Sequence, residues 1–189
     1  MRKIRDPDLI ERLQGLPIQP LHTKLWRITR AGRDPLLATS PKGRWDDGSF
    51  DVLYTALAPD TARAELHWHL LRSQPVFPSA VKLHLHELAL RGNSTISIPT
   101  LADLESIGID TSRYGTLDYA RLNQEYSPTQ KIGEAANFLG HDALIVPSAR
   151  WPSQNLVVLT GNLCSNGLRY VADHGPQDLR QWAVDHAVV

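Results

Sequence analysis

Polar side chains stand at several positions where the neighbouring residues are apolar, and their types suit a site for a small anionic ligand. Arg27 interrupts an apolar strand pattern, which is costly unless its guanidinium meets an anion or lines a cleft. Arg44 stands between a glycine and a tryptophan, and Tyr54 lies inside a second strand pattern. Glu65 lies among small apolar residues in a helical pattern, and Ser148 follows directly on a continuous apolar run, at a strand end where sites often lie.

Each of these residues also has an ordinary structural interpretation. Arg27 can pair with a structural carboxylate, and Arg44 can be a simple loop cation. A tyrosine such as Tyr54 belongs to a core more often than to a site, and Glu65 alone is a solvated helix residue at least as often as a catalyst. Ser148 alone is nearly uninformative, so the five residues gain weight only as a set.

Histidine spacing gives weak support for a metal site. His84 and His86 share one face of a strand pattern, yet Lys82 lies on that face too, and the pattern indicates an exposed face. His67 and His69 are two apart in a helical pattern and therefore point apart. The phosphate-binding loop, the dinucleotide fingerprint, the nucleophile elbow and the metalloprotease motif are all missing from the sequence. We expect no metal, and the common nucleotide hydrolases, dehydrogenases and serine hydrolases are disfavoured.

Composition and charge exclude further classes of protein. The 189 residues are 42% hydrophobic, enough for an ordinary core, and Lys plus Arg (20) balance Asp plus Glu (20). A nonspecific nucleic-acid binder or a membrane-surface protein would normally carry a basic excess, so we expect neither partner. The single cysteine, Cys164, excludes an intramolecular disulfide and a cysteine-rich zinc site. With no signal-peptide pattern and no membrane-length apolar stretch, we expect a cytoplasmic protein.

Apolar periodicity and Gly/Pro punctuation indicate the elements that must position these side chains. Helices are expected over 7–14 (capped by Asp6), 59–72, 100–107, 130–139 and 178–184, and strands over 25–28, 52–56, 81–88, 143–146 and 156–159. Residues 112–127 are expected to form a helix or an ordered excursion. Strands and helices mix without regular alternation, which favours an α+β fold. Residues 17–20 read as a linker, so we divide the chain into an N-terminal helix and linker (1–20) and one domain (21–189).

Taken in order, the candidate residues resemble the RES-domain family, named for its Arg, Glu and Ser. The matching segments are Leu25–Ile28, Gly43-Arg44-Trp45, Leu53–Ala56, Thr61–Glu65, Gln130–Gly133, Val146–Arg150 and Asn155–Val158. Together they span roughly residues 22–160. One residue departs from the pattern: Asp46 stands where family members usually have Asn after the Gly-Arg-Trp/Phe motif.

The resemblance implies a toxin of a type II toxin–antitoxin pair that acts on NAD as its substrate, with no further cofactor. It implies an α+β fold similar to the ADP-ribosyltransferases, with mixed, mainly antiparallel sheets and flanking helices. The expected partner is an Xre-like antitoxin that covers the active site. Within this reading Glu65, Arg27 and Ser148 are catalytic, and the NAD-binding residues are Arg27, Arg44, Tyr54, Ser148 and Asn155.

The resemblance leaves the reaction open. We favour NAD degradation by hydrolysis or phosphorolysis, and the alternative is a mono-ADP-ribosyltransferase that modifies a cellular protein. A catalytically silent nucleotide-binding module is a second alternative, which only Asp46 favours. A toxin directed at nucleic acid fits poorly with the zero net charge.

Overall fold

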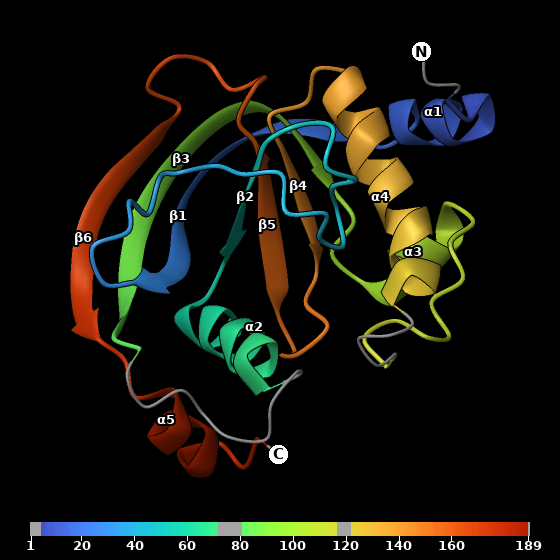
Figure 1. Cartoon of the computed structure of the whole chain (residues 1–189). Helices are drawn as coiled ribbons and strands as arrows, with labels where there is room; N and C mark the ends of the chain where they lie inside the picture. Colours follow the sequence, from blue (N-terminus) through green and yellow to red (C-terminus); the bar gives the residue numbers. More distant parts are fainter. Residues whose placement is uncertain (1–4, 72–80, 117–121, 189) are drawn as a thin grey trace.

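The computed structural model describes residues 5–71, 81–116 and 122–188 of the chain. The elements in chain order are α1 (Pro7–Gln14), β1 (Ile18–Arg30), β2 (Val52–Ala56), α2 (Pro59–Leu71), β3 (Leu83–Ser97), α3 (Leu101–Ser106), α4 (Leu122–Phe138), β4 (Ala143–Pro147), β5 (Gln154–Leu159), β6 (Leu168–Pro176) and α5 (Leu179–Asp185). Strands and helices do not alternate regularly, and all but one of the strand pairings are antiparallel. The predicted α+β class, with a mixed, mainly antiparallel sheet and flanking helices, is confirmed (Figure 1).

The strands pair in the order β1-β2-β5-β4-β3-β6, and β1 also pairs with β3. Five strands therefore form a ring of pairings, and β6 extends it on the free part of one edge of β3. The length of β3 makes this possible, because its first half pairs with β6 while its last residues, Thr95–Ser97, pair in parallel with β4. All five strands of the ring contribute to one buried cluster, formed by Leu25, Leu53, Leu88, Leu90, Ala143, Leu156 and Val158.

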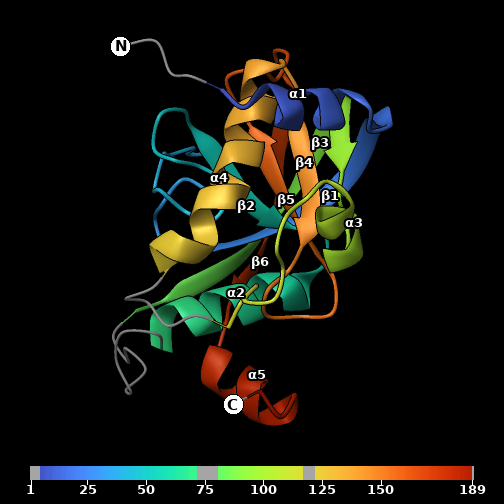
Figure 2. The same ribbon diagram turned by 90° about the vertical axis from the view of Figure 1, so that its right-hand side faces the viewer.

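A second, larger cluster lies between the sheet and three helices. Figures 1 and 2 show α1, α3 and α4 together on one side of the sheet. Alternate residues of β5 divide between the clusters: Val157 and Leu159 face the helices, and Leu156 and Val158 face the interior of the ring. β5 is thus buried on both faces, which explains its near-continuous apolar run.

Helix α1 begins at the predicted residue, because the Asp6 side chain accepts hydrogen bonds from the Asp8 and Leu9 N–H groups. Leu9 and Leu13 are buried in the larger cluster. Residues 17–20 were expected to form a linker, and this is wrong for 18–20, which begin β1 and pair with β3. The division of the chain at residue 20 stays a prediction.

Two other expectations need correction. No strand was expected over 168–176, where β6 lies, and β3 continues nine residues beyond the strand predicted to end at 88. Helix α4 begins at Leu122 rather than at 130, and residues 112–116 form turns. Residue 72, the predicted end of α2, and residues 117–121 of the expected excursion lie outside the described residues. No helix of the described chain has the length and apolar character to cross a bilayer.

Candidate active site

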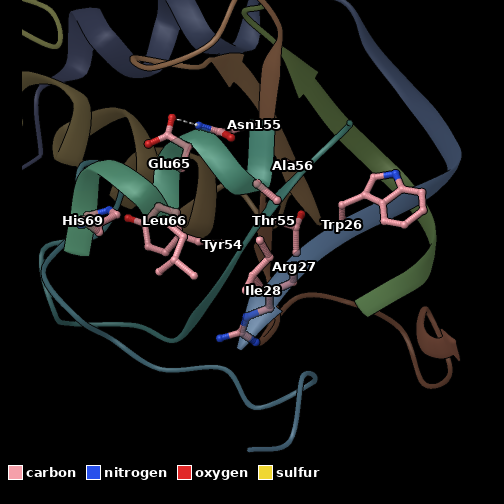
Figure 3. A pocket seen from close by; sticks show the side chains of 11 residues that line it. Trp26, Arg27, Ile28, Tyr54, Thr55, Ala56, Glu65, Leu66, His69 and Asn155 are labelled. Atoms are coloured by element: carbon pink, nitrogen blue, oxygen red, sulfur yellow. Dashed lines mark hydrogen bonds between the residues drawn. The ribbon is translucent and has the colours of Figure 1, made fainter. Parts of the chain in front are cut away.

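A pocket of about 210 Å³ lies between α2 and the strands β1, β2 and β5 (Figure 3). Four of the six predicted site residues line it: Arg27, Tyr54, Glu65 and Asn155. Its other lining residues are Trp26, Ile28, Thr55, Ala56, Ala62, Leu66 and His69. Residues far apart in the sequence therefore meet at one concave, mainly apolar surface with a few polar groups, as ligand sites usually do.

Glu65 is held at this pocket by three donors to one carboxylate oxygen. Oε1 accepts hydrogen bonds from Ser148 Oγ (2.7 Å), Asn155 Nδ2 (2.7 Å) and, more weakly, the Ala149 N–H (3.3 Å). The other oxygen, Oε2, makes no hydrogen bond or ion pair with the described residues. A carboxylate held by one oxygen keeps a fixed direction and leaves the second oxygen for a ligand.

Ser148 does not itself line the pocket, and it reaches Glu65 from the loop that follows β4. Its Oγ accepts from the N–H groups of Arg150 and Trp151 at 3.1 Å each, while its hydroxyl hydrogen points to Glu65. The two N–H groups fix the orientation of the hydroxyl. Ser148 therefore orients the carboxylate.

Arg27 lies on β1 and lines the pocket. Nη1 donates to the carbonyl oxygens of Pro35 (2.7 Å) and Leu37 (3.1 Å), so the arginine also holds the loop that follows β1. Burial and, secondarily, the nearby Arg33 lower the pKa of Arg27 to about 10, and Asp34 opposes them. The side chain is still a cation at neutral pH, and desolvation strengthens its attraction for an anion.

Tyr54 presents its ring to the pocket, and its hydroxyl serves the loop over residues 42–48. The hydroxyl accepts from the Trp45 N–H (2.9 Å) and donates to Asp46 Oδ2 (2.8 Å). Burial and the neighbouring Asp46 carboxylate raise the pKa of Tyr54 well above its ordinary value. Tyr54 is therefore a neutral ring with an occupied hydroxyl, suited to stacking.

Asp46, the departure from the family pattern, is the centre of that loop. It is fully buried and accepts from the N–H groups of Lys42, Gly43 and Gly48 and from Tyr54. Each carboxylate oxygen accepts at least two hydrogen bonds, which satisfies a buried charge. An aspartate at this position thus shapes the loop, and its contacts give it no direct place at the pocket.

Arg44 is not among the residues that line the pocket. Its guanidinium lies over the rings of Tyr114 (4.3 Å) and Tyr126 (4.8 Å). Of the predicted site residues, the structure thus brings five together, four at the pocket and Ser148 through Glu65, and places Arg44 beside a tyrosine pair.

Three pocket residues on α2 were not among the predicted site residues: Ala62, Leu66 and His69. With Glu65 they recur at the spacing of one helix face, a signal that was present in the sequence. Trp26 also lines the pocket, although only its neighbour Arg27 was predicted as a site residue. Its ring lies 5.0 Å from the ring of His174 on β6, a strand that was not predicted.

The opposite face of α2 is held by α5. Trp182 Nε1 donates to Asp60 Oδ1 (2.9 Å), and Arg63 Nη1 donates to the same oxygen (2.7 Å). Burial raises the pKa of Asp60, but the hydrogen bonds from Arg63 and Trp182 outweigh it, and the pKa lies below its usual value. The helix that carries Glu65 is therefore fixed from both sides.

The expectation of an exposed histidine face on β3 is wrong for His86. His86 is buried, its Nε2 lies 3.0 Å from Thr29 Oγ1, and burial lowers its pKa. His84 is half-buried and bonds Asp173 of β6 (2.7 Å). β6 accounts for the difference, because it covers this edge of β3. Among the described residues, no group of three or more His, Cys, Asp or Glu side chains is placed to hold a metal ion.

Comparison with known proteins identifies the family to which the chain belongs. A search of curated proteins finds no match. Among solved structures, the fold matches a chain of the crystal structure of the M. tuberculosis MbcT–MbcA toxin–antitoxin complex, with a TM-score of 0.77 and 20% sequence identity, over 96% of this chain and 98% of that chain. The model of the RES domain matches residues 24–179, a range that holds Arg27, Glu65 and Ser148. The chain is therefore a member of the RES-domain family.

Proposed function

We propose that this protein is the toxin of a toxin–antitoxin pair and that it cleaves the nicotinamide–ribose bond of NAD. The toxin role is supported by membership of the RES-domain family and by a fold shared with a chain of a toxin–antitoxin complex. The chemistry is supported by the site. The observation that carries the proposal is that Glu65, a residue of the pocket lining, is held through Oε1 while Oε2 remains open to a ligand.

Glu65 suits the charge that develops in this cleavage. When the bond between ribose C1′ and the nicotinamide nitrogen breaks, the electron pair leaves with the nicotinamide, which becomes neutral. Positive charge then spreads over C1′ and the ring oxygen of the ribose, and a fixed carboxylate lowers the energy of that state. Glu65 Oε2 either faces this charge or accepts a hydrogen bond from a ribose hydroxyl.

The second half of the reaction needs a nucleophile but no covalent bond to the protein. Water, phosphate or a side chain of an acceptor protein forms the new bond to C1′, and any proton it loses goes to solvent. Ser148 and Asn155 keep the carboxylate aimed during both steps, since both donate to Oε1. Because a preorganised carboxylate needs no rearrangement at the moment of reaction, its orientation contributes directly to the rate.

Arg27 and Tyr54 supply binding in this proposal. With the described residues the Arg27 guanidinium forms hydrogen bonds through Nη1 alone. Its Nε and Nη2 donors suit a phosphate oxygen of the substrate. The Tyr54 ring stacks on the nicotinamide or the ribose and keeps water away. The pocket of about 210 Å³ is smaller than a typical drug-sized site, so it takes the reacting end of the dinucleotide and leaves the rest outside.

The test is release of nicotinamide from NAD by the purified protein, measured by liquid chromatography. Glu65→Gln keeps the shape and the Oε1 acceptor but removes the charge, and we expect a loss of about a thousandfold in rate, equal to about 4 kcal/mol of transition-state stabilisation. Glu11→Gln is the matched control, because Glu11 is an exposed residue of α1 remote from the pocket lining. Wild-type protein that neither releases nicotinamide nor labels a protein from NAD would refute the enzymatic proposal.

The products separate the remaining alternatives. ADP-ribose indicates hydrolysis, its 1″-phosphate indicates phosphorolysis, and a mass gain on a cellular protein indicates ADP-ribosyl transfer. Saturable NAD binding with unchanged NAD would indicate a silent nucleotide-binding module. We lean to NAD degradation.

The partner in this proposal is an Xre-like antitoxin that covers the pocket. Because Glu65 and Arg27 line the pocket, a protein laid across it would exclude NAD from both residues. We expect NAD to protect the pocket from the antitoxin in a competition assay, and the antitoxin to slow nicotinamide release in proportion to its occupancy. An antitoxin that binds fully without slowing release would contradict a covered active site.

A further inference from the structure

We propose that Arg44 is a positioning residue that does not bind the NAD pyrophosphate. It holds the loop over residues 148–153, the Ser148 loop, through Tyr114. This role of Arg44 rests on the proposed function, because the loop that Arg44 holds orients Glu65 for the proposed cleavage of NAD. It departs from the role that the sequence suggests for Arg44. The observation behind it is the place of the guanidinium over two tyrosine rings rather than in the pocket lining.

The backbone of Arg44 is fixed from several directions. Its carbonyl oxygen accepts from Thr129 Oγ1 (2.6 Å) of α4, and the carbonyl of Gly43 accepts from Gln130 Nε2 (2.8 Å). The next residue, Trp45, donates its N–H to Tyr54. This backbone fixes the direction of the Cα–Cβ bond of Arg44, and from it the side chain extends to the rings of Tyr114 and Tyr126.

The cation joins two elements that are separate in the chain. Tyr126 is a buried residue of α4, and Tyr114 belongs to the segment over residues 111–116, in which 112–116 form turns. A guanidinium over both aromatic faces attracts each ring through its quadrupole, and burial strengthens that attraction. Arg44 therefore fixes the 111–116 segment relative to α4.

The 111–116 segment in turn holds the Ser148 loop on both sides of Ser148. The Tyr114 hydroxyl donates to the carbonyl of Pro147 (2.8 Å), and the carbonyl of Gly115 accepts from Arg150 Nη1 (2.6 Å). At Gly115 the backbone approaches so closely that a Cβ would lie 3.1 Å from Ala149 Cβ and from its carbonyl oxygen. Gly115 also has a φ of +75°, which favours glycine.

Arg150 extends the chain of contacts to the helix that carries Glu65. Its guanidinium lies over the ring of Trp68, 3.6 Å from the ring centroid, and Trp68 stands on α2 three residues after Glu65. Contacts therefore run from Arg44 through Tyr114 to both partners of the Ser148–Glu65 hydrogen bond. A shift of the loop by about 1 Å is enough to lower a rate about a hundredfold.

Kinetics separate the two roles of Arg44. For Arg44→Met we expect kcat for NAD to fall at least about tenfold with KM changed less than about threefold, because the lost group acts on orientation rather than on binding. Nicotinamide mononucleotide, which lacks the pyrophosphate, should show the same fold loss. Arg44→Met in a Tyr114→Leu background should add less than about twofold to the loss, since Arg44 acts through that ring. Arg44→Lys keeps a cation over the rings and should recover part of kcat.

The opposite results would overturn the inference: a raised KM with unchanged kcat, a loss confined to NAD, or losses that multiply in the double variant. Arg180→Met is the matched control, because Arg180 is an exposed residue of α5. A thermal melt of each variant confirms that it is folded. Should Arg44→Met fail to fold, Arg44→Lys and Tyr114→Phe, which keeps the ring and removes the bond to Pro147, carry the same comparison.

A readout without catalysis distinguishes failure of this inference from failure of the proposed function. Trypsin cuts after Arg113, next to Tyr114, and mass spectrometry measures the rate of that cut. We expect Arg44→Met to be cut at least about fivefold faster than the wild type and Arg180→Met, as local opening becomes easier. Equal rates would show that Arg44 does not hold the segment. If the wild type cleaves no NAD but this difference appears, the proposed function fails while the structural connection stands.

Discussion

Ser148→Ala tests the hydrogen-bond network around Glu65 through the stability of the fold. The substitution removes the bond to the Glu65 carboxylate and leaves the N–H groups of Arg150 and Trp151 without their acceptor. The bond to a charged group contributes about 2 kcal/mol, and each part-buried N–H, which water can reach, about 0.5 kcal/mol. The free energy of unfolding should therefore fall by about 3 kcal/mol.

For a chain of this length, a loss of that size lowers the melting temperature by roughly 6–12 °C, measured by calorimetry at neutral pH. Ser106→Ala is the matched control. It removes a single bond from an exposed hydroxyl to the carbonyl of Asp103 and should cost less than about 0.5 kcal/mol. Equal effects of the two substitutions would mean that the bonds of Ser148 do not stabilise the protein.

A double-mutant cycle makes the test specific to the Ser148–Glu65 pair. The losses for Ser148→Ala and Glu65→Gln are compared with the loss for both together. The two residues should couple by about 1 kcal/mol, because Glu65→Gln keeps the Oε1 acceptor and turns a charged hydrogen bond into a neutral one. Coupling below about 0.3 kcal/mol would refute the claim that Ser148 orients the carboxylate.

Three other substitutions test the surroundings of the site. Gly133→Ala should destabilise by at least about 2 kcal/mol, although alanine normally stabilises a helix interior, because a Cβ would overlap the Trp45 carbonyl; Gly161→Ala, which has open space, should be neutral in the same urea titration. Asp46→Asn should cost about 1–3 kcal/mol in that assay, since one amide NH₂ replaces an oxygen that accepts from Gly43 and Tyr54; a neutral result would mean that the loop rearranges freely. Asp60→Asn should destabilise near pH 7 and lose its effect in acid. The pKa of Asp60 is lower in the folded protein than its usual value of 3.8, so its contribution is complete above about pH 4 and disappears as the pH falls through the folded pKa. An effect of equal size at pH 3 and pH 7 would contradict this.

The sequence predicted an element correctly where one local property, such as burial on both faces or a helix cap, determined the residues of a segment. Continuous apolar residues over 143–146 and 156–159 predicted β4 and β5, and the Asp6-Pro7 pair marked the start of α1. β6 was missed because, among the described residues, it pairs with β3 alone and most of its side chains are exposed. Its sequence therefore carries no apolar alternation. The same omission made His86 look exposed.

Within the site, residue types were predictable and contacts were not. An isolated Glu among apolar residues marked Glu65, but no local pattern says that Ser148 and Asn155, 83 and 90 positions away, donate to the same oxygen. Arg44 illustrates the limit, because its type suits a phosphate equally well as two tyrosine rings. Only the register of the strands and the path of the 111–116 segment decide between them.

The separation of these partners along the chain bears on when the protein becomes active during its own synthesis. A ribosome releases residues from the N-terminus, so α2 emerges long before β5 and α5. Until residues 148 and 155 have both left the exit tunnel, the Glu65 side chain lacks at least one of its two side-chain donors. The network around Glu65 can therefore form only after the segment that carries Ser148 and Asn155 has been synthesised.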